Sequence, residues 1–268
     1  MAHLGNLNLW HPEVAVLIGL VAALYHHGVR NASSGHPGST VRRSQYVAFG
    51  LALAVFYLAI GSPLAAFSEV DNFAAYSLQM ALMTMIFPRL LLYSVPVDRL
   101  SRWTDLPVFG SIWRGLTHPP IAALAYNVIA TFLLLPLSVD TLLIDNDAHA
   151  FGQMLLMFFS LCLWWPLSRG TPSAPSVRPG AQLLYILISF NLMMPIVVAL
   201  LVTSGSTFHL PNWYRAFSHS STFFHLTPSE GQTTGALILA AFMLVSYGLR
   251  AIQAWLHMRH AHLPSSSV

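Results

Sequence analysis

Charged residues are scarce in this sequence. Of its 268 residues only 8% are Asp, Glu, Lys or Arg, whereas 55% are hydrophobic. Soluble globular domains carry about 25% charged residues, because their surfaces must stay hydrated. The composition therefore excludes a water-soluble fold and predicts an integral membrane protein.

Lysine is absent, and Cys162 is the only cysteine. A single thiol excludes an internal disulfide and a cysteine-based zinc or iron–sulfur site. Without Lys there is no phosphate-binding GxxxxGK[ST] loop, and no Ser–His–Asp set or cysteine nucleophile is recognisable. The basic residues are all Arg, without a run of five, so the sequence gives no support for nucleic-acid binding. We predict a protein that is not an enzyme.

Apolar segments dominate what is present. A helix that crosses a bilayer needs about 20 predominantly apolar residues. Seven segments meet this requirement, at about 12–28, 45–63, 72–92, 119–138, 149–167, 181–204 and 234–257. The first segment has no preceding Lys or Arg and no small-residue cleavage site, so we expect it to be retained. These segments predict an all-α bundle of seven transmembrane helices that forms one domain over residues 1–268.

The arginines predict the topology of this bundle. Eleven of the twelve follow the first, third, fifth and seventh spans, and Arg215 alone falls on the other side. Because basic residues concentrate on the cytoplasmic side, the N-terminus is predicted outside and the C-terminus in the cytoplasm. Seven of the nine acids fall on the predicted outer side: Glu13, Glu69, Asp71, Asp140, Asp145, Asp147 and Glu230.

No ionisable residue is predicted near the middle of a span. Ion-coupled transporters usually place at least one there, so this distribution disfavours transport. Pro88, Pro136 and Pro195 lie within spans and fit either tolerated kinks or broken-helix binding sites. An outward-facing transporter of a metal or small solute stays as the alternative function.

Thirteen histidines need an explanation in such an apolar chain. Imidazole suits copper and zinc, although it also tolerates a half-hydrated interface. The tail histidines fit a helix end beside anionic lipid headgroups. Haem ligation by His26 and His27 is disfavoured, because adjacent helical residues point about 100° apart. The histidines on the predicted outer side are His3, His11, His149, His209, His219 and His225.

The third predicted span carries a methionine pattern. Tyr76, Met80 and Met83 stand at i, i+4 and i+7, which places them on one face of a regular α-helix. Thioethers are soft ligands that favour Cu(I). Methionine also fills apolar cores, so packing is the alternative role for Met80 and Met83.

Several landmarks occur in a recognisable order. Gln79 precedes Pro88 and a Leu-rich exit, and Pro136 and Asp140 close the fourth span. His149 precedes Trp164-Trp165-Pro166 by one helix. Glu230, Gln232 and Gly235 lead into the seventh span. In these features the chain resembles the CtaG-like family of bacterial cytochrome c oxidase assembly proteins, which are seven-helix inner-membrane proteins implicated in copper delivery to heme–copper oxidases.

The chain departs from this family at its histidines. Where the family has paired histidines in the third and fifth spans, this sequence has Tyr76, Met80 and Gln153, and Leu134 takes the place of a histidine in the fourth span. His149 is the one imidazole retained. Paired histidines on facing helices would converge on one metal ion, so their loss disfavours the copper chemistry that the resemblance implies.

Two interpretations follow from the resemblance. In the first, copper binds weakly through Met80, Met83 and His149, helped by the outer-loop histidines. In the second, the copper site is lost and the bundle acts as a scaffold for oxidase assembly or architecture, which the thin ligand set favours. The expected partners are membrane lipid and oxidase subunits or copper chaperones, and the expected location is the bacterial inner membrane. The predicted outer mouth comprises Tyr76, Gln79, Asp140, Gln153, Glu230 and Gln232.

Overall fold

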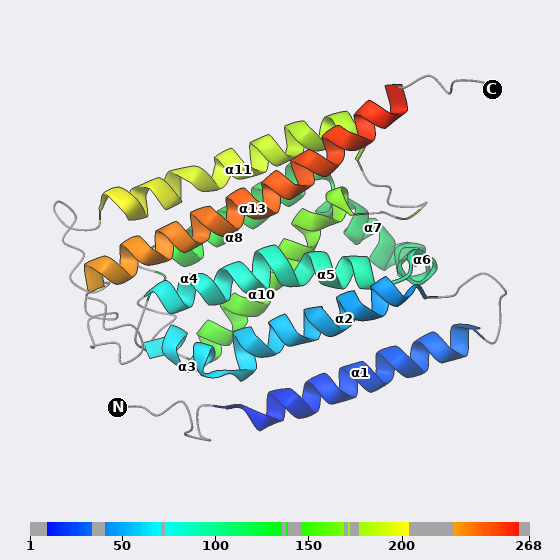
Figure 1. Cartoon of the computed structure of the whole chain (residues 1–268), viewed down its shortest axis with the longest axis horizontal. Helices are drawn as coiled ribbons and strands as arrows, with labels where there is room; N and C mark the ends of the chain where they lie inside the picture. The colour runs from blue at the N-terminus through cyan, green and yellow to red at the C-terminus, as the bar shows by residue number, and fades with distance from the viewer. Residues whose placement is uncertain are drawn as a thin grey trace.

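The computed structural model describes residues 10–33, 41–70, 73–135, 138, 146–168, 171, 177–203 and 228–262, and every element in these ranges is a helix (Figure 1). The all-α prediction is confirmed. The helices in chain order are α1 (Pro12–Ser33), α2 (Arg43–Phe56) with a π-helical continuation (Tyr57–Gly61), α3 (Pro63–Val70), α4 (Phe73–Ala81), a second π-helical segment (Leu82–Ile86), α5 (Phe87–Ser94), α6 (Val97–Thr104), α7 (Pro107–Leu116), α8 (Pro119–Leu134), α10 (Asn146–Trp164) with a 3-10 turn (Trp165–Leu167), α11 (Pro179–Val202) and α13 (Pro228–His262).

Proline determines where several of these helices begin. It occupies the first turn of α5, α7, α8 and α11. In α7, α8 and α11 the first-turn N–H groups have no acceptor within the helix, so proline loses nothing there. Pro195 instead lies inside α11, and the helix continues through it without interruption.

Five helical stretches are long and apolar enough to cross a membrane: Arg43–Gly61, Phe73–Ser94, Asp147–Leu167, Pro179–Val202 and Ser229–Arg259. The pair α7 and α8 qualifies as a sixth, although its two helices are bent by 72°. These six coincide with the second to seventh predicted spans. The first predicted span forms α1, which is not among the qualifying stretches. The structure thus has five or six candidate spans, and the total of seven stays a prediction.

The third predicted span, 72–92, is not one regular helix. It consists of α4, a π-helical segment and α5, and the break lies next to Pro88. Proline cannot supply the N–H that would bond the Thr84 carbonyl in an α-helix. The indole Nε1–H of Trp164 on α10 donates to this carbonyl at 2.7 Å. A neighbouring helix thus supplies the hydrogen bond that Pro88 removes, as the membrane interior requires.

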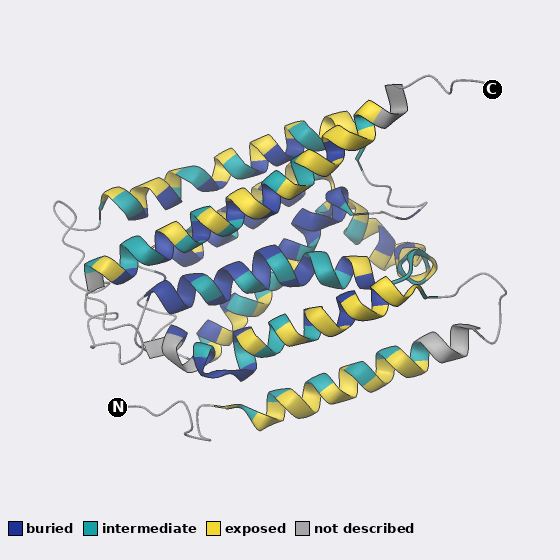
Figure 2. Cartoon of the chain, in the orientation of Figure 1, coloured by how far each residue is buried: buried dark blue, intermediate teal, exposed yellow. Residues whose placement is uncertain are grey.

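The stretch formed by α4 and α5 lies inside the bundle. Figure 2 shows dark-blue, buried residues along α4, and α13 packs against this helix. Small residues such as Ala74, Ala75 and Ala236 are buried along these helices. Since the hydrophobic effect does not drive association within lipid, close packing of small residues is the usual way in which membrane helices adhere.

Helix α1 lies at the edge of the bundle, with one side uncovered (Figures 1 and 2). Hydrogen bonds attach it to the bundle: the His11 N–H, just before α1, donates to the Gly61 carbonyl at 3.1 Å, and the Tyr25 hydroxyl, in the middle part of α1, donates to the Ser94 carbonyl at 2.9 Å. Tyr25 also stacks on Phe49, with ring centroids 3.8 Å apart. The apolar residues Val16, Leu17, Leu20 and Leu24 are exposed.

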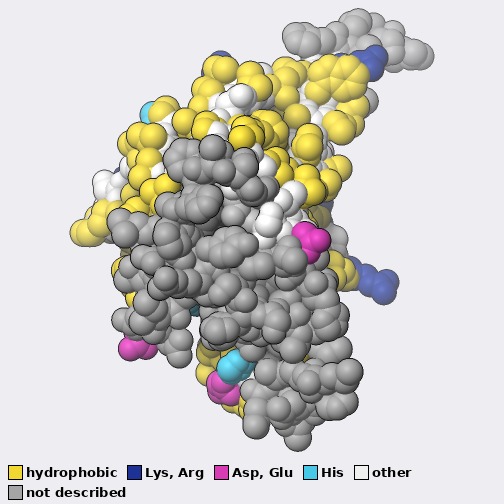
Figure 3. Space-filling view, turned by 90° about the vertical axis from the view of Figure 1, so that its left-hand side faces the viewer, with side chains coloured by type: hydrophobic (Ala, Val, Ile, Leu, Met, Phe, Trp, Pro, Cys, Tyr) yellow, Lys and Arg dark blue, Asp and Glu magenta, His cyan; other side chains and the backbone are white. Residues whose placement is uncertain are grey.

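The arginines gather at one end of the bundle. The starts of α2 and α11, the ends of α5 and α13, and the short helices α6 and α7 all lie at the right-hand end of Figure 1. These elements carry Arg42, Arg43, Arg89, Arg99, Arg102, Arg114, Arg178, Arg250 and Arg259. Figure 3 looks onto the opposite end, where acidic and histidine side chains are visible and basic side chains of the described residues appear at the margin. Arg169 and Arg215 fall outside the described residues.

Candidate functional site

Helices α4 and α10 bring four of the predicted site residues together. The rings of Tyr76 on α4 and His149 on α10 meet edge to face, with centroids 6.2 Å apart and an interplanar angle of 62°. His149 is buried, in the second turn of α10. One turn later, Gln153 Nε2 donates to Gln79 Oε1 at 3.4 Å. The predicted proximity of these side chains is therefore present in the structure.

Gln79 connects two further elements through hydrogen bonds. Its Oε1 accepts from the Ser68 hydroxyl at 2.8 Å, and its Nε2 donates to the Ala59 carbonyl at 2.9 Å. Ala59 lies in the last turn of the helix that ends at Gly61, beyond which Ser62 is extended. The last four carbonyls of a helix have no intrahelical partner. Gln79 thus caps the carboxyl end of the candidate span Arg43–Gly61.

Tyr76 and Gln232 play the same role at two other helices. The Tyr76 hydroxyl donates to the Leu133 carbonyl at 3.4 Å, next to the end of α8. Gln232 Nε2 donates to the Leu200 carbonyl at 2.8 Å and to the Thr203 hydroxyl at 3.1 Å, where α11 ends. The last carbonyls of these helices have no partner within the helix, and the two side chains supply the missing donors. Sequence reasoning placed both residues in a mouth and did not identify this capping role.

The start of α13 contacts the bundle through a glycine. A Cβ added to Gly235 would lie 2.5 Å from Phe73 Cδ1 and 2.6 Å from Ser77 Oγ, so α13 approaches α4 more closely than any other residue would permit. Glu230 is exposed at the start of the helix. Gln232 is directed toward α11, so its hydrogen bonds do not join it to the pair formed by Tyr76 and His149.

Met80 and Met83 are both buried, and Met80 has no exposed surface. Met80 belongs to α4, whereas Met83 belongs to the π-helical segment that begins at Leu82. A π turn contains more residues than an α turn, so the regular spacing that would align Met83 with Tyr76 and Met80 ends at Ala81. Both thioethers lie among packed side chains of the interior.

The ligand set at α4 and α10 does not match a paired-histidine metal site. His149 is its imidazole, and Leu134, at the place of a family histidine, is buried in the apolar core. Within the described ranges, no group of three or more His, Cys, Asp or Glu side chains is arranged to hold a metal ion. Asp140, His209, His219 and His225 lie outside these ranges.

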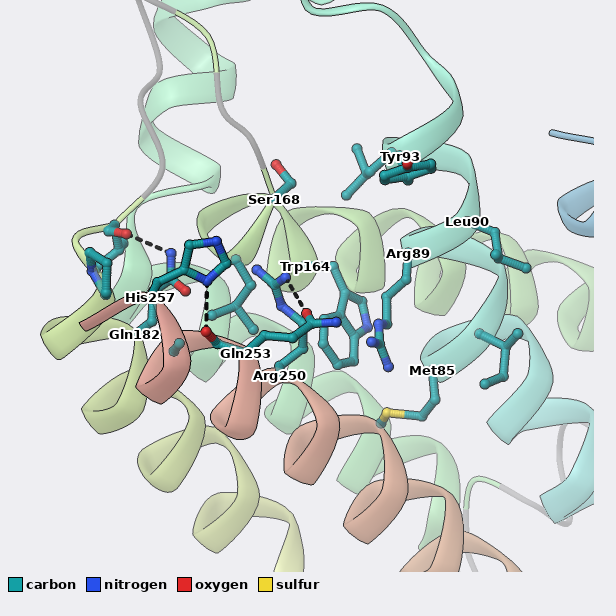
Figure 4. A pocket seen from close by; sticks show the side chains of 16 residues that line it. Met85, Arg89, Leu90, Tyr93, Trp164, Ser168, Gln182, Arg250, Gln253 and His257 are labelled. Atoms are coloured by element: carbon teal, nitrogen blue, oxygen red, sulfur yellow. Dashed lines mark hydrogen bonds between the residues drawn. The ribbon is translucent and has the colours of Figure 1, made fainter. Parts of the chain in front are cut away.

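A second feature lies at the arginine end, where sequence reasoning identified only topology markers. A cavity of about 830 Å³ is present between α5, α10, α11 and α13 (Figure 4). Two of its lining residues, Arg89 and Arg250, lie inside apolar candidate spans rather than after them. Their position within spans is the feature of the sequence that could have indicated this cavity. The Arg89 guanidinium carbon lies 5.0 Å from the Trp164 ring centroid, so the Trp-Trp-Pro segment contributes to this cavity.

The fold and these contacts define the chain as a multi-helix membrane protein whose polar side chains support helix ends. Comparison with known families identifies it further. Residues 23–261 match the family of the cytochrome c oxidase caa3 assembly factor, and the chain belongs to this family. Neither a curated protein nor a solved structure matches the chain.

Proposed function

We propose that the chain supports the assembly or architecture of a heme–copper cytochrome c oxidase as a non-catalytic membrane scaffold with a degenerate or absent copper site. Membership of the caa3 assembly-factor family supports the oxidase connection. One observation carries the scaffold role: Tyr76, Gln79 and Gln232 donate to carbonyls at the ends of neighbouring helices. Side chains engaged in this way stabilise the bundle.

The proposal includes a topology with seven spans, in which α1 is the first, the N-terminus is outside and the C-terminus is cytoplasmic. The gathering of nine described arginines at one end of the bundle supports this orientation through the positive-inside rule. The proposed location is the bacterial inner membrane, where a terminal oxidase resides.

The proposed partners are oxidase subunits or copper chaperones, in addition to lipid. The exposed apolar side of α1, which includes Val16, Leu20 and Leu24, offers one membrane-embedded surface for helix–helix contact. Because one side of α1 is uncovered, that side can accommodate a neighbouring helix.

Co-purification tests the oxidase role. The affinity-tagged full chain would be isolated in mild detergent from its native host and analysed by mass spectrometry, with an unrelated tagged membrane protein as the control. We expect oxidase subunits to be enriched. Deletion of the gene should lower the amount of assembled oxidase in the membrane. Recovery without oxidase subunits, together with normal oxidase levels after deletion, would contradict the proposal.

Titration with Cu(I) against a competing chelator tests the degenerate copper site. We expect weak binding that is unchanged when His149 and Met80 are both replaced by Ala. The control pair, His118→Ala with Met154→Ala, alters two exposed residues away from α4. A tight stoichiometric complex that is lost in the His149 and Met80 double variant, and kept in the control, would contradict the hypothesis of a degenerate site. Copper uptake by vesicles that depends on the chain would establish transport instead.

A further inference from the structure

The cavity at the arginine end has the size of a ligand-binding site. Its volume of about 830 Å³ falls within the range of about 300–1,000 Å³ that is usual for small-molecule pockets. Arg89 extends into it from α5, and Arg250 extends into it from α13 (Figure 4). Helices that are distant in sequence thus present two cations to one space.

None of the described residues that line this cavity is acidic. Arg89 donates from Nη1 to the Ser246 carbonyl at 3.3 Å, and Arg250 donates from Nη1 to Gln253 Oε1 at 2.9 Å, so the acceptors in both bonds are neutral. A guanidinium carries five N–H donors. Among the described residues these bonds use one donor of each arginine, and the other donors stay available to a ligand.

Two partly buried cations without a carboxylate are unfavourable in an apolar bundle. Each loses hydration, and the two repel one another more strongly than they would in water. Charged residues within membrane spans are costly and usually mark a functional site. An anion between Arg89 and Arg250 would compensate both charges. The contact of Arg89 with the face of Trp164 holds its guanidinium in place beside the cavity.

The lining also indicates what carries the anion. Met85 and Leu90 lie on an apolar side of the cavity, whereas Gln182, Gln253 and His257 provide polar groups on the other side (Figure 4). Guanidinium groups bind phosphate oxygens in a bidentate manner. A free phosphate ion would gain nothing from the apolar side, whereas a phospholipid has both a phosphate and an acyl region to match the two sides.

We propose that this cavity binds the headgroup phosphate of an anionic phospholipid between Arg89 and Arg250. In the proposed topology the arginine end faces the cytoplasmic leaflet, whose anionic headgroups attract basic residues. This lipid site would exist whether or not the chain assists an oxidase.

Native mass spectrometry of the full chain, delipidated in detergent, tests the site. The probes are phosphatidylglycerol and phosphatidylcholine with identical acyl chains, and inorganic phosphate forms a separate arm. We expect phosphatidylglycerol to bind at least tenfold more tightly than phosphatidylcholine. Replacing Arg89 and Arg250 together by Gln should abolish this preference, and replacing both by Lys should retain part of it. Arg102→Gln is the matched control, because Arg102 is exposed on α6 at the same end.

The preference ratio is the affinity for phosphatidylglycerol divided by the affinity for phosphatidylcholine. It is measured on folded protein alone, so it stays interpretable where a variant is less stable. If the double Gln variant does not fold, each single Gln variant should lower the ratio at least threefold. An unchanged ratio in these variants would overturn the proposal. So would an equal affinity of the unmodified chain for both lipids, or displacement of phosphatidylglycerol by stoichiometric inorganic phosphate.

Discussion

Trp164 and Pro88 lie on different helices and meet at one carbonyl group. Pro88 has no N–H for the Thr84 carbonyl, and the Trp164 indole donates to that carbonyl at 2.7 Å. Trp164 also stacks on Tyr247, with ring centroids 5.3 Å apart. The Trp-Trp-Pro segment carried part of the family resemblance. Its first Trp has a structural role here, because it donates a hydrogen bond to a backbone carbonyl at the break in the neighbouring span.

Trp164→Phe should lower the free energy of unfolding by about 1–3 kcal/mol, because a buried carbonyl loses its donor while an aromatic ring is retained. In a Pro88→Ala background residue 88 regains its N–H, so the same replacement should cost less. Unfolding of the four proteins in one detergent measures this coupling as a double-mutant cycle. An equal cost in both backgrounds would show that the two residues act independently.

At the scale of helices, the apolar segments in the sequence predicted the elements well. Every predicted span contains a helix, because span length and hydropathy are local properties. The π-helical segments Tyr57–Gly61 and Leu82–Ile86, and the 72° bend between α7 and α8, were not predicted. The two π-helical segments receive hydrogen bonds from neighbouring helices, and a single sequence does not show those neighbours. The bend lies at Thr117 and His118, directly before the prolines that begin α8.

The contact between α13 and α4 depends on the absence of a side chain at Gly235. Gly235→Ala should lower the free energy of unfolding by about 1–3 kcal/mol, since the added methyl group overlaps with Phe73 and Ser77. Gly248→Ala is the matched control in the same helix. It has no heavy atom within 4 Å of the added Cβ, and it should gain about 0.5–1 kcal/mol from helix propensity. Thermal unfolding in detergent compares the two variants, and equal stability would rule out the close approach.

At the scale of the molecule, the sequence grouped several polar residues but did not reveal their hydrogen-bond partners. Tyr76, Gln79, His149 and Gln153 were predicted as one group and lie together on α4 and α10. Gln232 was included with them, yet it caps α11. Its direction follows from the packing of α13 between α4 and α11, which is a tertiary property. Arg89 and Arg250 were used only to predict the topology. Their shared cavity could not be predicted, because it forms only when the helices pack together.

Sidedness is the property of the whole chain that most needs a measurement. Cys162 is buried and is the only cysteine, so Cys162→Ala provides a cysteine-free background. Single cysteines at Trp10, Arg102 and Asp147, which are all exposed, would be labelled in spheroplasts with a membrane-impermeant maleimide. We expect Trp10→Cys and Asp147→Cys to react at once, and Arg102→Cys to react only after permeabilisation.

The Trp10 position separates seven spans from six. If α1 crosses the membrane, position 10 lies on the same side as position 147, because four crossings separate them: α1, Arg43–Gly61, Phe73–Ser94 and the pair of α7 and α8. If α1 does not cross, three crossings separate the two positions and they lie on opposite sides. If Asp147→Cys is labelled and Trp10→Cys is not, α1 does not cross the membrane. If only Arg102→Cys is labelled, the topology is the inverse of the proposed one.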